Sequence, residues 1–387
     1  MQDFIFNLPT KIIFGKDKVS EIGKHIKKFG PKVFMLYGEG SIKNIGVYDI
    51  VIDSLKKEGL DVIEYSGVKS NPVLSHTNKG IKVAKEKRVN CILGVGGGSV
   101  IDEAKAIATG FYYKGNVWDF YKGKRNVNKA LPIVSVLTIP ATSSEVNGGT
   151  VLTNEETRQK FGFFNQHLIP QVSILDPKVT FSIPAEYTAY SAVDVISHML
   201  EGYLTNEADL VPVQDRIIEV LIKTVMESTE IILKDPKNYQ ERAIFMWSAS
   251  LANSGIPSAG LGNWSAPNHM FGHVLGGYYD IPHGASLSII IPAWMKYNLE
   301  EKTEKFAKLA RNVFGVNKKD EKENAKVAVQ EFKKWFKKIG APVSFGDAGL
   351  PTNELNDLVE GMMEVAKIWG IKGYSRNVIL KILKLAL

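Results

Sequence analysis

The sequence predicts an α/β amino-terminal half, in which helices flank a parallel sheet, followed by an all-helical carboxyl-terminal half. Short apolar runs alternate with helical segments over the first half, and long amphipathic segments follow one another from Pro184 onward. At 387 residues the chain exceeds one ordinary domain. We therefore expect two domains, 1–183 and 184–387.

Four apolar runs in the first half are typical of buried parallel strands; they cover 32–37, 61–65, 91–95 and 132–138. Helical patterns follow the first three of these runs, over 48–58, 74–87 and 100–109. Continuous apolar strands that alternate with helices form parallel sheets covered on both faces. This half is therefore predicted to be a helix-flanked parallel sheet.

The second half is predicted to be helical because its apolar residues recur at helical spacing and convincing strand patterns are absent. The clearest helical segments cover 187–204, 215–233, 239–254, 302–313 and 321–338. No internal repeat interrupts them.

Composition excludes several classes of protein. A hydrophobic content of 44% and a charged content of 23% exclude global disorder. The net charge is +7, but the lysines are scattered without an Arg-rich stripe, so no nucleic-acid partner is expected. Cys91 is the only cysteine, which excludes an internal disulfide and a thiolate zinc site. No apolar stretch reaches the ~18–20 residues of a membrane span, and no signal peptide is visible. We expect a soluble cytoplasmic protein with no membrane partner.

A glycine-rich turn, Gly94-Val-Gly96-Gly97-Gly98-Ser99, follows the third predicted strand and opens a helix. Glycines let a backbone approach a ligand closely, and a helix amino terminus favours a phosphate. A tight turn without a ligand would explain this pattern equally well. Asp102, further along the helix, is expected to help cap its first turn.

A second turn, Gly38-Glu39-Gly40-Ser41, follows the first strand. Ligands of doubly wound sheets lie beyond the carboxyl ends of the strands, so two such turns favour a dinucleotide. Ser41 and Lys43 would accommodate a 2′-phosphate, which favours NADP(H), whereas the carboxylate of Glu39 would repel it.

A third turn after the last predicted strand runs from Thr138 to Gly149 and is rich in hydroxyl groups. Such groups can hydrogen-bond a phosphate, a ribose or a substrate oxygen. An ordinary Ser/Thr turn is the competing explanation. Taken with the two glycine turns, the pattern favours a ligand.

Histidines and one aspartate of the second half have spacings that predict a metal site. Asp194 and His198 are four residues apart, as are His269 and His273, and His283 follows in a Pro-His-Gly sequence. Side chains four apart share one helix face and can share one ion. An aspartate with histidines suits a divalent transition metal without selecting one. Five candidates exceed four tetrahedral positions; His273 is the best spare, able to move a proton or orient a substrate, and Glu201 is a potential partner of a ligand.

Together these motifs resemble the iron-containing (group III) alcohol dehydrogenases over essentially the full length, and most closely their butanol dehydrogenase and NADPH-dependent aldehyde reductase branch. The segments that carry the resemblance are Tyr37-Gly-Glu-Gly-Ser-Ile-Lys43, Ser66-Gly-Val-Lys-Ser-Asn71-Pro72, Gly94-Val-Gly-Gly-Gly-Ser-Val-Ile-Asp102, Leu137-Thr-Ile-Pro-Ala-Thr-Ser-Ser-Glu145 and the three histidine motifs.

The resemblance implies an α/β amino-terminal dinucleotide-binding domain, an all-α carboxyl-terminal metal-binding domain and a homodimer. It implies that four residues bind the metal: Asp194, His198, His269 and His283. His273 would lie near the nicotinamide as a catalytic group, and Ser144 would face the substrate. The remaining expected cofactor contacts are Gly38, Ser41, Asn71, Gly97, Gly98, Ser99, Asp102, Thr138, Thr142, Asn147 and Lys160.

The implied activity is hydride transfer between NAD(P)(H) and a primary alcohol or aldehyde, such as butanol and butanal. NADP(H) is favoured over NAD(H), and the metal would be iron or zinc, or else nickel or cobalt. Three departures are Glu39, where the branch usually has glycine, the unusual segment 262–268 before the third ligand, and Gly272, where the family often has glutamate. A lyase resembling dehydroquinate synthase and a non-redox metalloprotein are the alternatives.

Overall fold

The computed structural model describes residues 1–208 and 210–387, which form two compact units. The α/β unit contains Asn7–Ile183 together with Pro236–Ser250. The helical unit contains Met1–Phe6, Pro184–Asp235 and Leu251–Leu387. The chain thus passes from the α/β unit into the helical unit near Pro184, and returns to the α/β unit for one further segment.

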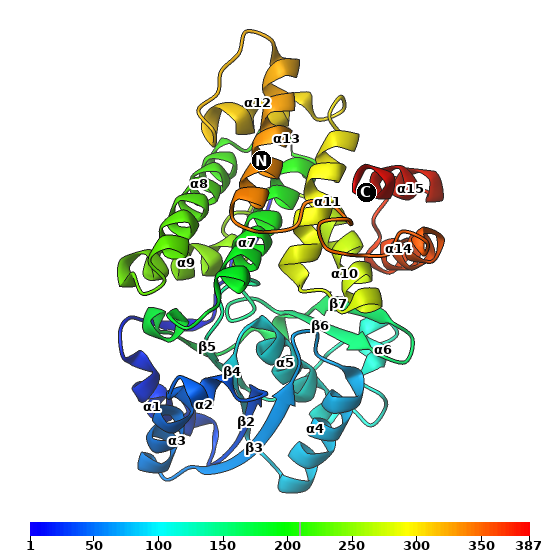
Figure 1. Ribbon diagram of the computed structural model, residues 1–387. Helices are drawn as coiled ribbons and strands as arrows, with labels where there is room; N and C mark the ends of the chain where they lie inside the picture. Colours follow the sequence, from blue (N-terminus) through cyan, green and yellow to red (C-terminus); the bar gives the residue numbers. More distant parts are fainter. Residues whose placement is uncertain (209) are drawn as a thin grey trace. The chain divides into compact units, whose positions relative to one another are not determined.

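Six parallel strands form the sheet of the α/β unit, in the order β1-β8-β5-β4-β2-β3 (Figure 1). Their bounds are β1 (Lys11–Phe14), β2 (Lys32–Gly38), β3 (Asp61–Val68), β4 (Cys91–Gly96), β5 (Ile133–Leu137) and β8 (Val172–Leu175). The predicted parallel sheet is confirmed, and the four predicted strands lie side by side in it. β1 and β8 were not predicted, because strands of four residues show too little periodicity to stand out.

Helices cover both faces of this sheet. Apolar side chains of α1 (Ile22–Ile26) and α3 (Val47–Lys57) pack on one face, where Val51 and Leu55 are fully buried. The other face is covered by α4 (Leu74–Lys87) and α5 (Gly98–Tyr112). Met246 of α9 (Tyr239–Ala252) joins a small apolar cluster there. Short helices complete the unit: η1 (Lys18–Glu21), η2 (Lys27–Phe29), α2 (Ser41–Asn44), α6 (Trp118–Tyr121), η3 (Gln166–Leu168) and η4 (Pro177–Thr180).

An antiparallel hairpin departs from the expected pattern of strands and helices. It consists of β6 (Gly149–Asn154) and β7 (Gln159–Phe164), and it forms a sheet of its own. Its strands mix polar and aromatic residues on both faces, so no clear alternation marks them in the sequence. The hairpin extends the chain directly from the hydroxyl-rich turn, so it fixes where that turn ends.

The helical unit is built from long helices, and its described residues form no strand. The bounds are α7 (Ala185–Thr205), α8 (Pro212–Lys234), α10 (Pro267–Tyr279), α11 (His283–Tyr297), α12 (Thr303–Asn312), α13 (Glu321–Lys338), α14 (Leu355–Trp369) and α15 (Arg376–Leu385). Proline occupies the start of α8 and α10, where its missing N–H costs nothing. α7 packs against α8, α10 and α11, and it is therefore buried over most of its length. The all-helical character predicted for this region is confirmed.

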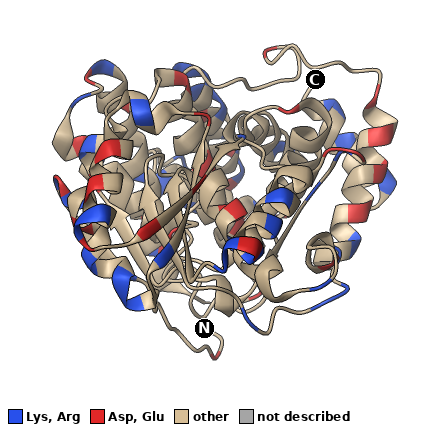
Figure 2. Ribbon diagram, turned by 90° about the horizontal axis from the view of Figure 1, so that it is seen from below, with Lys and Arg blue, Asp and Glu red and all other residues tan. Residues whose placement is uncertain are grey.

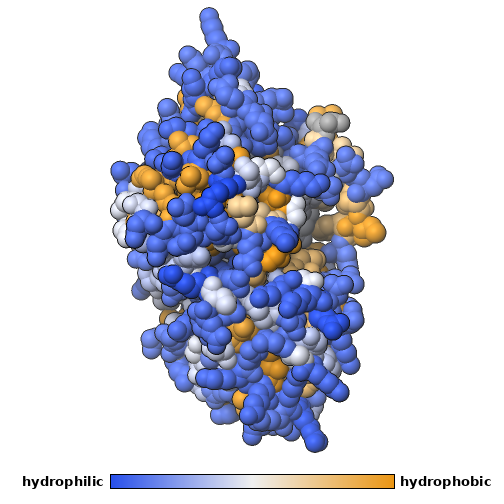
Figure 3. All heavy atoms as spheres, turned by 90° about the vertical axis from the view of Figure 1, so that its right-hand side faces the viewer, coloured by the Kyte–Doolittle hydropathy of each residue, from blue (hydrophilic) through white to orange (hydrophobic). Residues whose placement is uncertain are grey.

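Charged residues of both signs are interspersed along the surface helices (Figure 2). The face seen in Figure 3 is mostly hydrophilic, with hydrophobic residues in scattered patches. Among the described residues, the helices are too short or too polar to cross a lipid bilayer.

Candidate functional site

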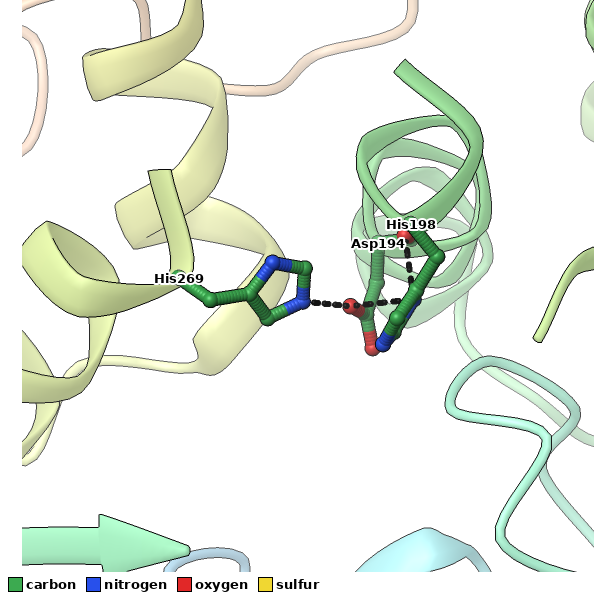
Figure 4. A group of neighbouring side chains, drawn as sticks. All are labelled: Asp194, His198 and His269. Atoms are coloured by element: carbon green, nitrogen blue, oxygen red, sulfur yellow. Dashed lines mark hydrogen bonds and ion pairs between the residues drawn. The ribbon is translucent and has the colours of Figure 1, made fainter. Parts of the chain in front are cut away.

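One carboxylate oxygen lies at the centre of a cluster of imidazole rings in the helical unit (Figure 4). Asp194 and His198 come from α7, His269 from α10, and His283 is the first residue of α11. Oδ1 of Asp194 is 3.4 Å from Nδ1 of His198, 3.7 Å from Nε2 of His269 and 3.8 Å from Nε2 of His283. The fold thus brings His269 and His283 to the Asp194–His198 pair of α7.

These spacings fit a shared divalent ion. Two ligands that each lie about 2.1 Å from a tetrahedral ion are separated by about 3.4 Å, which is longer than a hydrogen bond. The ligand atoms of Asp194, His198 and His269 all lie within 4.8 Å of one another. One carboxylate with imidazoles is also a donor set that first-row transition metals accept. The arrangement therefore fits one ion shared by Asp194, His198 and His269, and Nε2 of His283 lies 3.8 Å from the same carboxylate oxygen.

A hydrogen bond to the backbone of α7 fixes which nitrogen of His198 is free to bind a metal. His198 is buried, which lowers its pKa, and its Nδ1 lies 2.9 Å from the carbonyl oxygen of Asp194. That carbonyl accepts the Nδ1 proton, so the lone pair of the neutral ring is on Nε2. A neutral imidazole with a fixed tautomer is what a metal ligand requires.

Glu201 fixes the second ring. Its carboxylate accepts hydrogen bonds from Nδ1 of His269 at 2.5 Å and from the backbone N–H of His269 at 3.0 Å. Burial opposes a charged ring, but Glu201 and Asp194 raise the pKa of His269 to about 10. The negative field that favours an imidazolium favours a bound cation equally. Sequence spacing placed Glu201 one turn after His198, yet its partner is on another helix.

Two glycines allow the three ligand-bearing helices to approach each other. A Cβ on Gly284 would lie 2.0 Å from the carbonyl oxygen of Tyr190, in the backbone of α7. A Cβ on Gly272 would lie 3.0 Å from Oγ of Ser286 and 3.1 Å from Leu287, both in α11. Gly272, noted as a departure from the family pattern, is therefore also a packing requirement between α10 and α11.

His273 lies beside this cluster. It is on α10, one turn after His269, and is 4% exposed. Its ring centroid is 5.4 Å from that of His283 and 6.4 Å from that of His269. Trp369, at the end of α14, packs edge-on against it at 4.8 Å. His273 is thus adjacent to the predicted ligands, and Trp369 is a neighbour that no sequence pattern indicated.

Replacing Glu201 by glutamine is expected to weaken metal affinity by about 10- to 100-fold, because the amide still accepts a hydrogen bond but carries no charge. Competition with a fluorescent chelator measures this change. The matched control is Glu186→Gln on an exposed turn of the same helix, which should bind metal like the parent. Equal affinity in both variants would contradict the assigned role of Glu201.

In the α/β unit, strand order places two of the three predicted turns next to each other. The chain proceeds from β2 outward to β3, and after β4 it continues in the opposite direction to β5. The reversal falls between the paired strands β2 and β4, where Tyr37 lies opposite Val95. Ligands of open parallel sheets bind at such a switch point. The Gly38 turn and the glycine-rich turn therefore both lie at the position a dinucleotide would use.

The glycine-rich turn is packed directly against the third turn, Thr138–Gly149, which we call the hydroxyl loop. A Cβ on Gly98 would lie 2.4 Å from Oγ1 of Thr142, and one on Gly97 would lie 3.1 Å from Ile139. The N–H of Thr138 also bonds to the carbonyl of Gly96 at 2.9 Å. Gly98 begins α5, a helix of 15 residues whose positive amino-terminal end suits a pyrophosphate.

The other predicted cofactor residues fall into distinct groups. Asn71 accepts a hydrogen bond from Nζ of Lys160 at 2.7 Å. Ser99 donates its hydroxyl to the carbonyl of Ser70. Ser41 begins α2 and is exposed. Asn147 lies within the hydroxyl loop, where its side chain donates to the carbonyl of Thr142 at 3.2 Å.

Asp102 does not cap the first turn of α5, contrary to the expectation from the sequence. Its carboxylate accepts hydrogen bonds from the hydroxyl of Ser144 at 2.5 Å and from the N–H of Val151 at 3.1 Å. As the fifth residue of α5, it lies beyond the free amides of the helix start. Lys105, three residues later and fully buried, contacts the same loop. In the sequence Lys105 follows Asp102 and Glu103 closely, so nothing there marks it as buried.

Known proteins match the whole chain. Residues 9–177 match the family described as iron-containing alcohol dehydrogenase, and residues 188–387 match the carboxyl-terminal domain of the same family. A probable NADH-dependent butanol dehydrogenase of Bacillus subtilis is 38% identical, with 100% of both chains covered. The NADPH-dependent aldehyde reductase YqhD of Escherichia coli is 33% identical over 94% of each chain.

Solved structures agree with this assignment. The crystal structure of NADH-dependent butanol dehydrogenase A from Thermotoga maritima has a TM-score of 0.95 and 44% identity, covering 100% of this chain and 99% of that one. The structure of Escherichia coli YqhD has a TM-score of 0.94 and 31% identity, with the same coverage. Because both family regions match and the solved structures share its fold, this chain belongs to the iron-containing alcohol dehydrogenase family.

Proposed function

We propose that this protein interconverts primary alcohols and aldehydes of butanol-like size with NAD(P)(H) as the hydride carrier. As a member of its family it is an NAD(P)(H)-dependent oxidoreductase. The observation that carries the proposal is the convergence of His198, His269 and His283 on one oxygen of Asp194. The dehydroquinate-synthase-like and non-redox alternatives are not favoured by the family assignment.

Each half of the chain has a defined part in this reaction. A divalent ion held by Asp194 and the three histidines would act as a Lewis acid on the substrate oxygen, and the nicotinamide would supply the hydride. The protein positions both groups. Glu201 holds the Nδ1 proton of His269, and the glycine-rich turn with the start of α5 supports the pyrophosphate. We propose iron or zinc as the resident metal, since the family is described as iron-containing and zinc accepts the same donor set.

His273 is proposed to contact the substrate or the nicotinamide. Its ring centroid lies 5.4 Å from that of His283 and 6.4 Å from that of His269. Trp369 packs against its edge and restricts its orientation. A buried imidazole that is held in one orientation next to the metal ligands is suited to orient a substrate oxygen and hold its proton.

The activity is tested with metal-loaded protein, butanal and either NADH or NADPH. We expect loss of reduced-nicotinamide absorbance that stops on addition of a chelator and returns when a divalent metal is restored. Ferrous and zinc ions are compared in the restoration step. A protein that oxidises neither cofactor at any metal loading would refute the proposed function.

Cofactor choice is proposed to depend on charges after β2. The carboxylate of Glu39 is exposed at this strand end. The ammonium of Lys43 lies over the rings of Tyr37 and Tyr48, at 5.4 and 4.7 Å. Both tyrosine hydroxyls donate to Glu64 at 3.0 Å. The carboxylates of Glu39 and Glu64 outnumber the Lys43 ammonium, which already contacts two aromatic rings. This negative balance favours NAD(H) over the NADP(H) that the sequence favoured.

Glu39→Gln and Glu39→Gly should each raise the NADPH/NADH ratio of kcat/KM about five- to tenfold, because one like-charge repulsion with the 2′-phosphate is worth on the order of 1 kcal/mol. The matched opposite change, Lys43→Gln, should lower this ratio. Steady-state kinetics with both cofactors measure it. A ratio that is unchanged in all three variants would show that the adenosine ribose lies elsewhere.

A homodimer is proposed as the assembly. The start of the chain is anchored, since the N–H of Gln2 bonds to the carbonyl of Gly260 at 2.9 Å. Nevertheless Ile5 is 99% exposed, and Phe4 and Leu210 are also largely exposed. A second copy could cover this apolar surface. Light scattering coupled to gel filtration tests it: Ile5→Asp should shift the protein toward the monomer mass.

A further inference from the structure

Helix α5 carries two buried charged side chains on the face toward the hydroxyl loop. Lys105 is 0% exposed and Asp102 is 8% exposed, although the rest of this helix is made largely of small and apolar residues. Charges are retained in an interior only when partners compensate them. The partners of Lys105 and Asp102 therefore indicate the role of the two charges.

Lys105 directs its ammonium into the hydroxyl loop. It donates to Oγ of Ser144 at 2.7 Å, to the carbonyl of Gly149 at 2.6 Å and, more distantly, toward Oδ1 of Asn147 at 3.5 Å. An ammonium has three hydrogens to donate, and three oxygens of the loop surround it. One lysine thus connects α5 to both the middle and the end of the loop.

Asp102 holds the same loop through its carboxylate and its backbone carbonyl. One carboxylate oxygen accepts the Ser144 hydroxyl, the second accepts the N–H of Val151, and the Asp102 carbonyl accepts the Thr150 hydroxyl at 2.8 Å. The Ser144 hydroxyl donates its one hydrogen to Asp102 while it accepts from Lys105, and Ser144 is only 2% exposed. Its hydroxyl is therefore a bridge between two charges.

The bridge fixes the part of the loop that meets the glycine-rich turn. The N–H of Ser144 donates to Oγ1 of Thr142 at 3.2 Å, and Asn147 donates to the carbonyl of Thr142. Thr142 in turn packs so closely on Gly98 that no Cβ would fit there. The chain of contacts runs from the buried charges through Ser144 to the start of α5.

We propose that Asp102, Lys105 and Ser144 form a buried brace that positions the hydroxyl loop for the dinucleotide without touching it. This inference rests on the proposed function. It assigns Asp102 and Ser144, expected from the sequence to contact cofactor or substrate, as positioning residues, and it adds Lys105 to them. Thr142 and the glycine-rich turn are then the groups that the brace holds ready for the ligand.

Charge balance supports the brace. Burial lowers the pKa of Lys105 to about 8, while the nearby carboxylates of Asp102 and Glu145 act to raise it. At neutral pH the lysine is therefore still mostly charged. Removing the lysine side chain would leave the buried Asp102 carboxylate without its nearest cation. The loop would also lose the hydrogen bonds that it accepts from the ammonium.

The test measures the Kd of NADH by fluorescence titration without substrate, for Ser144→Ala, Lys105→Met and the double variant. Each single change should raise the Kd about tenfold or more. The double change should raise it no further than the larger single effect, because both substitutions disrupt the same brace. Metal content should stay at the parent value. KM for NADH should rise while kcat at saturating cofactor changes by less than the KM does.

Lys82→Met, on an exposed position of the neighbouring α4, is the matched control for the charge change and should bind NADH like the parent. Should Lys105→Met fail to fold, the same cycle is run with Asp102→Asn and Ser144→Ala. Unchanged Kd in Ser144→Ala, or fully additive effects in the cycle, would overturn the brace. Failure of the parent protein to bind NADH would instead overturn the proposed function.

Discussion

Asp194→Asn is expected to lower metal affinity by at least about 100-fold and to remove turnover in the same proportion. Asp194 provides the oxygen that all three histidines approach within 3.8 Å. Asparagine keeps the size of the side chain but removes the only negative charge among the four predicted ligands, and a neutral amide oxygen is a weaker donor for a divalent ion. Metal analysis after dialysis, alongside the butanal assay, measures both losses.

The comparison variant is His273→Ala, which distinguishes a metal ligand from a residue that only lies beside the ligands. It should keep the metal of the parent and lose about 10²- to 10⁴-fold in kcat, the range for a positioned acid–base group. If His273→Ala loses metal, or Asp194→Asn keeps it, the proposed division of roles is wrong. Circular dichroism of both variants excludes unfolding as the cause.

Gly284→Ala is expected to destabilise the protein by about 3 kcal/mol or more and to weaken metal binding as well. The added Cβ would lie 2.0 Å from the Tyr190 carbonyl oxygen, and this neighbour is backbone that cannot rotate away. To relieve the overlap, α11 must move from α7, which carries His283 away from Asp194. Urea unfolding and a metal-binding isotherm measure the two effects.

Gly346→Ala is the matched control. Gly346 is exposed, has no positive φ, and its added Cβ would meet only Oγ of Ser344 at 3.7 Å, an ordinary contact. The free energy of unfolding should therefore change by no more than about 0.5 kcal/mol. If the two variants are equally stable, the helix contact at Gly284 is looser than the structure implies.

Sequence patterns predicted those parts of the fold and site that depend on local periodicity. The spacing of four residues placed Asp194 and His198 on one face of α7, and the apolar runs identified β2 and β4. Residues such as those of β1 escaped prediction because four residues acquire strand geometry only from their neighbours in the sheet.

Contacts between distant segments could not be read from spacing. Glu201 is closest in sequence to His198, yet it bonds to His269 because α10 crosses α7 at that level. The family resemblance implied that Asp102 and Ser144 contact ligands, and spacing gave no sign that the Ser144 hydroxyl bonds to both Asp102 and Lys105. Residue type gives the chemistry a side chain can do; only tertiary packing determines which group it meets.

The metal cluster has a mechanical consequence as well as a chemical one. Its four side chains come from three helices, α7, α10 and α11, and span the chain from Asp194 to His283. An ion gripped there would clamp a long loop of polypeptide, so it would stiffen the helical unit much as a crosslink does. Chelation should therefore make these three helices more susceptible to proteolysis.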